Sequence, residues 1–375
     1  MLKNFRYRIY PTKKQQRTLD AHLEECRLLY NHLLEMRKTC YERDGVSLSC
    51  FQQQKTYPVL KEQRPSMREV HSQVLQNVAV RIDLAFKAFF RRCKTGEKPG
   101  YPRFKGYGRY DSLTYPQSGF SITHDDRVCL SKIGTIKMVY HRPIKGTIKT
   151  CTVHRSSTNK WDVTFSIEYE AERLPENDRA VGIDVGLKTF ATLSSGEEIA
   201  NPRFFRQEKK ALAKVQRKHA KLKKGTKERR THRKVIARVH ERIQWRRENF
   251  THQHSRKIVN QFGIICVEDL HVNRMVHTHC LALSISDAAW SQFFEQLSRK
   301  AAEAGRAFIK VNPAYTTQDC SRCHHRQKMP LSVRTYHCPC CFLVIDRDLN
   351  ASYNILGLGL QSRVIPEAPR LQAGE

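Results

Sequence analysis

Two closely spaced pairs of cysteines near the end of the chain have the spacing of a metal site. Cys320 and Cys323 form one C-x-x-C pair and Cys338 and Cys341 form another, with fourteen residues between the pairs. Four thiolates held in this way bind zinc in a closed tetrahedron, which stabilises a fold and leaves no position for a substrate. Cys340 lies inside the second pair and competes with Cys341 for the fourth position, where we favour Cys341. The prediction is one structural Zn²⁺.

Three carboxylates from separate parts of the chain are candidate ligands for a catalytic metal. Asp184 interrupts one apolar run, Glu268 and Asp269 end another, and Asp348 follows the second cysteine pair. Because side chains alternate along a strand, only one of Glu268 and Asp269 can share a face with Asp184, and we choose Glu268. Taken singly, each carboxylate fits a helix cap or a surface charge equally well. Together they suit two Mg²⁺ ions about 4 Å apart, which support phosphodiester hydrolysis.

Charge and composition restrict the partners of this chain. Its 375 residues include 67 Lys and Arg against 36 Asp and Glu, a formal net charge of +31, which implies a polyanionic partner. Nucleic acid is the first candidate. A membrane surface is a weaker one, because the sequence has no lipidation signal and no run of about 18 apolar residues. Without a secretory signal the chain should stay in a reducing cytoplasm, near the nucleoid, where its thirteen cysteines favour metal over disulfides.

One stretch gathers much of the positive charge. Residues 203–247 contain nineteen Lys and Arg and three Glu, and their apolar residues are too sparse to bury much surface. This pattern predicts a long basic helical hairpin, broken near Gly225, that contacts phosphates. A charge run is usually only a solvated face, but the imbalance here is one-signed. The candidate phosphate contacts are Lys214, Arg217, Lys221 and Lys224.

A second candidate nucleic-acid surface interleaves rings with cations. Residues 100–106 include Tyr101, Arg103, Phe104 and Lys105. Bases stack on aromatic rings while cations meet phosphates, so this composition suits nucleic-acid binding. A boundary loop with solvated charges is an equally good interpretation of the spacing.

Periodicity predicts the elements that must position these residues. Alternation at 5–9 predicts a strand with a basic face, after which Thr12 caps a helix, and another helix is predicted from about 70 to 92. Short strands follow from about 118 to 170, the clearest of them at 161–169. With the first strand they would form a small β-barrel interrupted by a helical insertion.

The second half of the chain has the pattern of an α/β domain. Residues 181–187 resemble the first hairpin of a ribonuclease H-like fold, in which flanking glycines permit a close approach by metal and phosphate. Residues 262–270 predict a buried parallel strand. Asp287 is predicted to cap the helix that follows it. A final helix covers 349–356, and the tail from residue 361 is expected to be loose.

The order of these motifs resembles the TnpB family of transposon-encoded, RNA-guided DNA nucleases, which are related to the ancestors of type V CRISPR effectors. The resemblance is carried by eight segments that span nearly the whole chain: residues 5–11, 30–31, 100–105, 182–186, 267–270, 284–290, 316–323 and 346–351. In the family pattern Asp-x-Asp-x-Asn-Ala the second Asp is catalytic. The resemblance therefore implies catalytic and Mg²⁺-binding roles for Asp184, Glu268 and Asp348, and leaves Asp346 as a neighbour or cap.

The resemblance also implies a multidomain architecture. An RNase H-like (RuvC) nuclease domain is expected to carry a zinc-ribbon insertion, after an N-terminal split β-barrel, the wedge, that holds a helical recognition insertion. The expected boundaries are 1–10 and 106–174 for the wedge, 11–105 for the recognition insertion, 175–318 and 342–361 for the nuclease domain with its hairpin at 203–257, 319–341 for the zinc ribbon, and 362–375 for a loose tail.

The function that the resemblance implies is RNA-guided cleavage of DNA, with a guide RNA from the transposon end and a short target-adjacent motif in the DNA. Two alternatives stay open: an RNA-guided regulator that binds DNA without cutting it, and a protein-only transposase or resolvase. The intact triad argues against the nuclease-dead relatives.

The chain departs from the family pattern at the zinc site. The glycine that usually follows each cysteine pair is replaced by His324 and Phe342, so less regular turns are expected there. His324, His325 and His337 also lie close enough in sequence to compete as zinc ligands.

Overall fold

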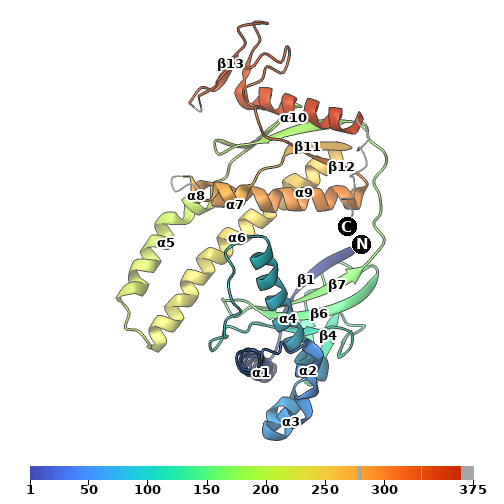
Figure 1. Cartoon of the computed structure of the whole chain (residues 1–375), viewed down its shortest axis with the longest axis vertical. Coiled ribbons are helices and arrows are strands. Elements are labelled where there is room, and N and C mark those ends of the chain that lie inside the picture. The colour runs from blue at the N-terminus through green and yellow to red at the C-terminus, as the bar shows by residue number, and fades with distance from the viewer. Residues whose placement is uncertain (278–280, 331, 365–375) are drawn as a thin grey trace. The chain divides into compact units, whose positions relative to one another are not determined.

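The computed structural model describes residues 1–277, 281–330 and 332–364, and these residues form two compact units. The first unit comprises Met1–Glu170 and the second Ala171–Glu375. Each is described by itself (Figure 1). None of the described helices is long and apolar enough to span a lipid bilayer.

The first unit is built on one antiparallel sheet with the strand order β2-β6-β7-β1-β5-β4-β3. Its strands are β1 Leu2–Tyr10, β2 Ser112–Tyr115, β3 Phe120–Ile122, β4 Arg127–Leu130, β5 Gly134–Met138, β6 Thr147–Arg155 and β7 Trp161–Glu168. The predicted strands at 5–9 and 161–169 are confirmed, and they pair with each other with Phe5 opposite Phe165. The inward residues of β7 are all buried: Trp161, Val163, Phe165 and Ile167.

Helices occupy the chain between β1 and β2. They are α1 Lys13–Asp44, α2 Cys50–Lys55, α3 Tyr57–Gln63, the 3-10 helix η1 Pro65–Glu69 and α4 Ser72–Lys94. Thr12 caps α1 as predicted, with a capping box to Gln15. Val74, Val78 and Ile82 of α4 are buried in the same core as the sheet, whereas Ala85 and Phe89, predicted on the same stripe, are only partly buried.

The small barrel expected here is not closed by backbone pairing. In the part of the chain that the structure describes, β2 and β3 end the strand order and do not hydrogen-bond to each other. The backbone N–H groups of Gln117 and Ser118, which lie between these strands, donate instead to Oε1 of Gln73 on α4 at 3.2 and 2.8 Å. The helical insertion thus satisfies two backbone donors of the loop that connects β2 and β3.

The second unit contains a five-stranded mixed sheet with the order β10-β9-β8-β11-β12. Its strands are β8 Ala180–Val185, β9 Thr189–Leu193, β10 Glu198–Ala200, β11 Ile264–Glu268 and β12 Ala307–Val311. The first three strands form an antiparallel meander, while β8, β11 and β12 are parallel. The predicted buried parallel strand is therefore confirmed as β11.

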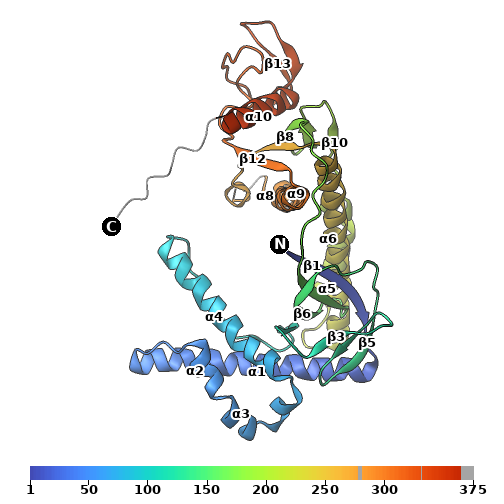
Figure 2. The ribbon, with the colours of Figure 1, turned by 90° about the vertical axis from the view of Figure 1, so that its right-hand side faces the viewer.

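Helices cover both faces of this sheet (Figures 1 and 2). The helices of this unit are α5 Phe204–Lys221, α6 Lys227–Gln261, α7 Val272–Met275, α8 Ala282–Ala288, α9 Trp290–Ala304 and α10 Arg347–Val364. Ile265 and Val267 of β11 share a core with α6 and α9, whereas Cys266 between them packs with Ile355 of α10. Alternation along β11 thus assigns one set of side chains to each face.

The last helix, α10, is longer than predicted. It continues to Val364, so the expectation of a loose tail from residue 361 is wrong for 361–364, and the rest of that tail lies outside the described residues. Two glycines let the helix approach the sheet. A Cβ atom on Gly359 would lie 2.2 Å from Sγ of Cys266, and Gly182 of β8 is equally crowded by the helix backbone. Gly182 therefore makes room for a helix, and not for a metal or phosphate as we expected.

The cysteine-rich segment forms a small ribbon at the start of α10. Its antiparallel strands are β13 Thr335–His337 and β14 Val344–Asp346, so the ribbon extends beyond the expected end at residue 341. Asn350 and Asn354 of α10 donate hydrogen bonds of 2.7–2.8 Å to the carbonyl oxygen of Asp319. These bonds tie the ribbon to the helix.

Candidate active site

Strand register brings Asp184 and Glu268 together. Ile183 of β8 pairs with Val267 of β11, so the residues that follow them are neighbours at the carboxyl ends of two parallel strands. Alternation places Glu268 on the face that Cys266 shares with α10, and Asp184 on the same face as Gly182. Each carboxylate residue is only 8% exposed. Asp269 is half exposed and pairs with Lys310 at 2.9 Å, away from this pair.

Asp348 reaches the same place from the first turn of α10. The carboxylate of Asp346 accepts the backbone N–H groups of Asp348 and Leu349 at 2.8 and 3.1 Å, so Asp346 caps the helix. Oδ2 of Asp348 lies 4.0 Å from where a Cβ atom would stand on Gly186, just beyond β8. The structure thus brings Asp184, Glu268 and Asp348 together from three separate elements.

The electrostatics of this cluster are those of crowded, buried carboxylates. Burial raises the pKa of Asp184 well above its ordinary value, and the charges of Glu268 and Asp348 raise it further, while Arg347 opposes the shift. Burial also raises the pKa of Glu268, against a hydrogen bond from Thr316 that lowers it. Hard oxygen ligands concentrated in this way fit a divalent cation, which would offset their mutual repulsion.

Three further residues contact the cluster, and sequence reasoning did not find them. Oγ1 of Thr316 donates to Oε1 of Glu268 at 2.6 Å. The guanidinium groups of Arg347 and Arg334 lie 3.2 and 3.5 Å from the carboxylate of Asp348. Arg334 precedes β13, so the zinc ribbon contributes a cation to the cluster. Arg347 directly precedes Asp348 in the sequence, but no spacing links Thr316 or Arg334 to the triad, since their contacts depend on the fold.

The four predicted zinc ligands form one group. The Sγ atoms of Cys320, Cys323, Cys338 and Cys341 all lie within 4.8 Å of one another. Two of the pairs, Cys320 with Cys341 and Cys323 with Cys338, are separated by 3.5 Å. A tetrahedral zinc with Zn–S bonds of about 2.3 Å requires sulfur atoms about 3.8 Å apart, so the thiols fit this ion. Cys340 is exposed and lies outside the group, as do the three histidines considered.

The turns at the two cysteine pairs are alike. The N–H groups of His324 and Phe342 donate to the carbonyl oxygens of Cys320 and Cys338 at 2.9 and 3.1 Å. Both residues have the left-handed backbone conformation usual for glycine, with φ of 59° and 58°. The expectation of irregular turns is therefore wrong: the geometry is kept and two non-glycine residues bear its strain.

The predicted basic hairpin consists of α5 and α6. Lys214, Arg217, Lys221 and Lys224 are all exposed, and within the described ranges none of them contacts a carboxylate. The chain turns between the helices at Gly225, whose φ is 88°. The hairpin thus presents cations that remain available to a polyanion.

Asp287 holds the start of this hairpin, which corrects its predicted role. Its carboxylate accepts the N–H groups of Phe205 and Arg206 at the beginning of α5 and pairs with Arg247 of α6 at 2.7 Å. The helix that follows Asp287 has Ala289 at its N-cap, with no side-chain cap. Asp287 therefore caps a helix that begins 83 residues earlier in the chain.

The aromatic–cationic segment at 100–106 is anchored to the first unit at both ends. The ring of Tyr101 packs edge-on against Phe86 and Phe89 of α4. The backbone of Lys105 exchanges hydrogen bonds of 2.7 and 3.0 Å with the Asn31 side chain on α1. Arg103 and Phe104, between these anchors, are exposed and therefore free to meet a partner.

Family models match three parts of the chain. Residues 164–279 match a family described as "Probable transposase", and residues 290–355 match "Cas12f1-like, TNB domain". Residues 1–45 match a "Helix-turn-helix domain", although in the structure they form β1 and one continuous helix, α1.

Two curated proteins and one solved structure are similar over nearly the whole chain. A protein of Streptomyces pristinaespiralis described as "Putative RNA-guided DNA endonuclease" is 32% identical, over 98% of this chain and 92% of its own length. InsQ of Escherichia coli (strain K12), with the same description, is 27% identical, over 96% of this chain and 92% of its own length. The structure of the mini-RNA-guided endonuclease Cas_phi3 matches with a TM-score of 0.51 at 9% identity, over 96% of this chain and 92% of its own, which supports the multidomain fold.

With 32% identity to a curated relative over almost its full length, and with matches to a transposase family and a Cas12f1-like domain, this chain belongs to the TnpB family.

Proposed function

We propose that this chain is an RNA-guided DNA endonuclease that hydrolyses phosphodiester bonds at a two-metal site held by Asp184, Glu268 and Asp348. The observation that carries the proposal is the meeting of these three carboxylates, from β8, β11 and the first turn of α10, on one face of the mixed sheet. The strand order β10-β9-β8-β11-β12 supports the RuvC-like assignment, because a ribonuclease H-like sheet also joins an antiparallel meander to parallel strands.

Each residue of the cluster has a role in this proposal. Asp184 and Glu268 would hold a metal pair from the sheet, and Asp348 would hold it from the helix. Bound divalent ions such as Mg²⁺ would supply an activated water and relieve charge on the leaving oxygen. Thr316 orients Glu268 through its 2.6 Å hydrogen bond, and Arg334 and Arg347 offset the negative charge around Asp348.

The proposed partners are a guide RNA from the transposon end and target DNA. The net charge of +31 supports a polyanionic partner, as do the exposed cations of the hairpin, Lys214, Arg217, Lys221 and Lys224. The curated relatives described above are named RNA-guided DNA endonucleases, which favours RNA and DNA together over DNA alone. In this proposal the first unit is the wedge with its recognition insertion, Arg103 and Phe104 meet nucleic acid, and the ribbon carries one structural Zn²⁺.

Cleavage by the purified complex tests the proposal. With its co-purified RNA and Mg²⁺ the chain should cut duplex DNA that matches the guide, and Asp184→Ala should bind the same DNA without cutting it. Unchanged cutting by Asp184→Ala would refute the site. Binding without cleavage over a range of Mg²⁺ and Mn²⁺ would favour the nuclease-inactive regulator. Activity that survives removal of the RNA would favour a protein-only transposase or resolvase.

A further inference from the structure

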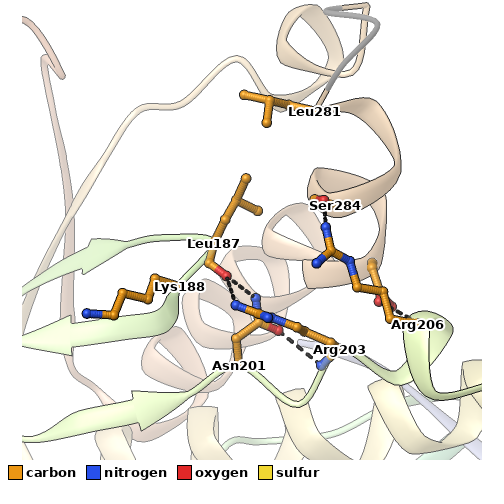
Figure 3. Close-up of a pocket in the computed structure, with 8 residues that line it drawn as sticks. Leu187, Lys188, Asn201, Arg203, Arg206, Leu281 and Ser284 are labelled. Atoms are coloured by element: carbon orange, nitrogen blue, oxygen red, sulfur yellow. Dashed lines mark hydrogen bonds between the residues drawn. The ribbon is translucent and has the colours of Figure 1, made fainter. Parts of the chain in front are cut away.

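A pocket of about 190 Å³ is lined in part by the turn that follows β8, the strand that carries Asp184 (Figure 3). Its wall comes from the β8–β9 turn with Leu187 and Lys188, from Asn201 and Arg203 before α5, from Arg206 in the first turn of α5, and from α8. Leu187 directly follows Gly186, the residue beside the Asp348 carboxylate. Leu187 therefore lies three residues after the candidate metal ligand Asp184, on the turn that follows β8.

The positive charge of the pocket is not neutralised by the residues around it. The Arg203 guanidinium donates a long hydrogen bond of 3.4 Å to the Leu187 carbonyl oxygen, and Arg206 donates one of 2.9 Å to Oγ of Ser284. Both acceptors are uncharged, and neither arginine pairs with a carboxylate in the described part of the chain. Each guanidinium has five donors, so most of them remain for a ligand.

Asp287, the acid in the pocket wall, does not cancel this charge. It is only 6% exposed, and its carboxylate is already engaged by Arg247 and by the backbone N–H groups of Phe205 and Arg206. Lys188 adds a third cation at the rim, although its nitrogen points away from the two arginines in Figure 3. Arg203 and Arg206 therefore define the chemistry of the pocket.

The backbone at Arg203 is in a conformation that costs free energy. Its φ of 50° and ψ of 49° lie in the left-handed region, which an L-residue with a side chain rarely adopts. Asn201 stabilises this turn, accepting the N–H of Arg203 at 3.1 Å and donating to the Leu187 carbonyl oxygen at 2.9 Å. The turn directs the Arg203 side chain back toward Leu187 (Figure 3), and strain of this kind is often associated with function.

The size and lining of the pocket indicate what it binds. Guanidinium groups bind phosphate through paired N–H donors. At about 190 Å³ the pocket is smaller than the roughly 300–1,000 Å³ sites of drug-sized molecules, so it suits one group of a longer chain. Leu187 and Leu281 supply an apolar wall that a sugar can pack against.

We propose that Arg203 and Arg206 bind one backbone phosphodiester of the DNA strand that is being cut, a few nucleotides from the scissile bond. This inference rests on the proposed endonuclease function, and it adds a contact that would set where the strand enters the metal site. A DNA strand is favoured over the guide RNA because Leu187 in the pocket wall lies three residues after Asp184 and directly follows Gly186, the residue beside the Asp348 carboxylate.

Methylphosphonate substitution tests this contact directly. Matched DNA is prepared with one uncharged methylphosphonate at each successive linkage near the cut, and binding by the protein–RNA complex is measured in EDTA, with cleavage measured separately in Mg²⁺. Arg203→Gly removes the guanidinium but suits the left-handed backbone, so the turn should be preserved. Arg299→Ala on α9, which removes an exposed cation elsewhere, is the matched control.

The wild-type complex and Arg299→Ala should each lose about 10-fold in affinity at one linkage near the cut, as expected for a charge-assisted hydrogen bond. Arg203→Gly should bind unmodified DNA about 10-fold more weakly and show no further loss at that linkage. The same response in wild type and Arg203→Gly at all linkages would overturn the proposal. The proposal would also be overturned if Arg203→Gly bound the guide RNA more weakly while its methylphosphonate scan of the DNA matched that of wild type. A complex that binds but never cuts would refute the endonuclease function, while the scan in EDTA would still decide whether the pocket binds DNA.

Discussion

Gly182 on β8 lies so close to α10 that a Cβ atom on it would be 2.1 Å from the carbonyl oxygen of Ser352. Because β8 carries Asp184 and α10 begins next to Asp348, this contact helps to set the separation of two candidate metal ligands. The distance between Asp184 and Asp348 thus depends on the absence of a side chain at Gly182.

Gly182→Ala should therefore impair the site by disturbing the packing of α10 on β8. The methyl group would push α10 off the sheet, which should lower the free energy of unfolding by about 1–3 kcal/mol and reduce DNA cleavage more than guide-RNA binding. Gly357→Ala is the matched control, since a Cβ atom there has nothing within 4 Å and should stabilise the helix by up to about 1 kcal/mol. Urea unfolding and cleavage rates check both variants, and full activity of Gly182→Ala would contradict this explanation.

The partly buried ion pair of Asp287 with Arg247 should anchor the basic hairpin. Asp287→Ala leaves Arg247 and two helix N–H groups without their acceptor, so we expect a loss of about 3 kcal/mol in the free energy of unfolding. In Asp287→Ala, amide hydrogen exchange should increase most, relative to wild type, at the start of α5. Glu168→Ala, which removes the exposed partner of Lys149, should change stability little. Equal effects of the two substitutions would show that Asp287 is not an anchor.

Zinc binding should distinguish adjacent cysteines. Elemental analysis should find about one zinc per chain in the wild type and in Cys340→Ser, whose thiol is exposed and outside the group of four. Cys320→Ser should lose the ion and unfold the ribbon, because the binding of structural zinc contributes directly to folding. Zinc retained by Cys320→Ser, or lost from Cys340→Ser, would contradict the assignment.

Much of this structure follows from short-range pattern. Alternation predicted β7, and a continuous apolar run predicted β11 as a parallel strand, since both signals depend only on which face each residue buries. The four cysteines were predictable for the same reason: their spacing fixes two local turns that nearly specify the zinc site.

What pattern could not predict are contacts between distant segments. Asp287 has the sequence of a local cap, but its partners are on α5 and α6. Gly182 had the pattern of a ligand-approach glycine, and only the docking of α10 shows which atoms crowd it. The contacts of Thr316 and Arg334 with the triad likewise require the folded ribbon.

The raised pKa of Asp184 has a consequence for stability. The folded chain holds this proton more tightly than the unfolded chain, whose Asp pKa is about 3.9, so the contribution of Asp184 to stability falls as the pH rises above that value. In EDTA, Asp184→Asn should therefore unfold at a higher temperature than wild type at pH 7, and the difference should vanish below about pH 4.

Asp269 is the matched control for this titration, because its pKa is shifted in the opposite direction. Lys310 lowers the pKa of Asp269, so its carboxylate stabilises the fold above the unfolded pKa and loses that effect as the pH falls. Asp269→Asn should give no gain at pH 7. Thermal unfolding at pH 4 and pH 7 tests both variants, and an Asp184→Asn protein less stable than wild type at pH 7 would refute this view of the site.

The most direct test of the central claim compares two adjacent carboxylates at the end of β11. Glu268 faces the Asp184 cluster and Asp269 faces Lys310. In Mg²⁺, with bound guide RNA and matched DNA, Glu268→Gln should lose at least about 100-fold in cleavage rate while Asp269→Asn retains it. Both variants should bind the DNA equally well. Equal cleavage by the two variants, or loss in Asp269→Asn alone, would contradict the proposed metal site.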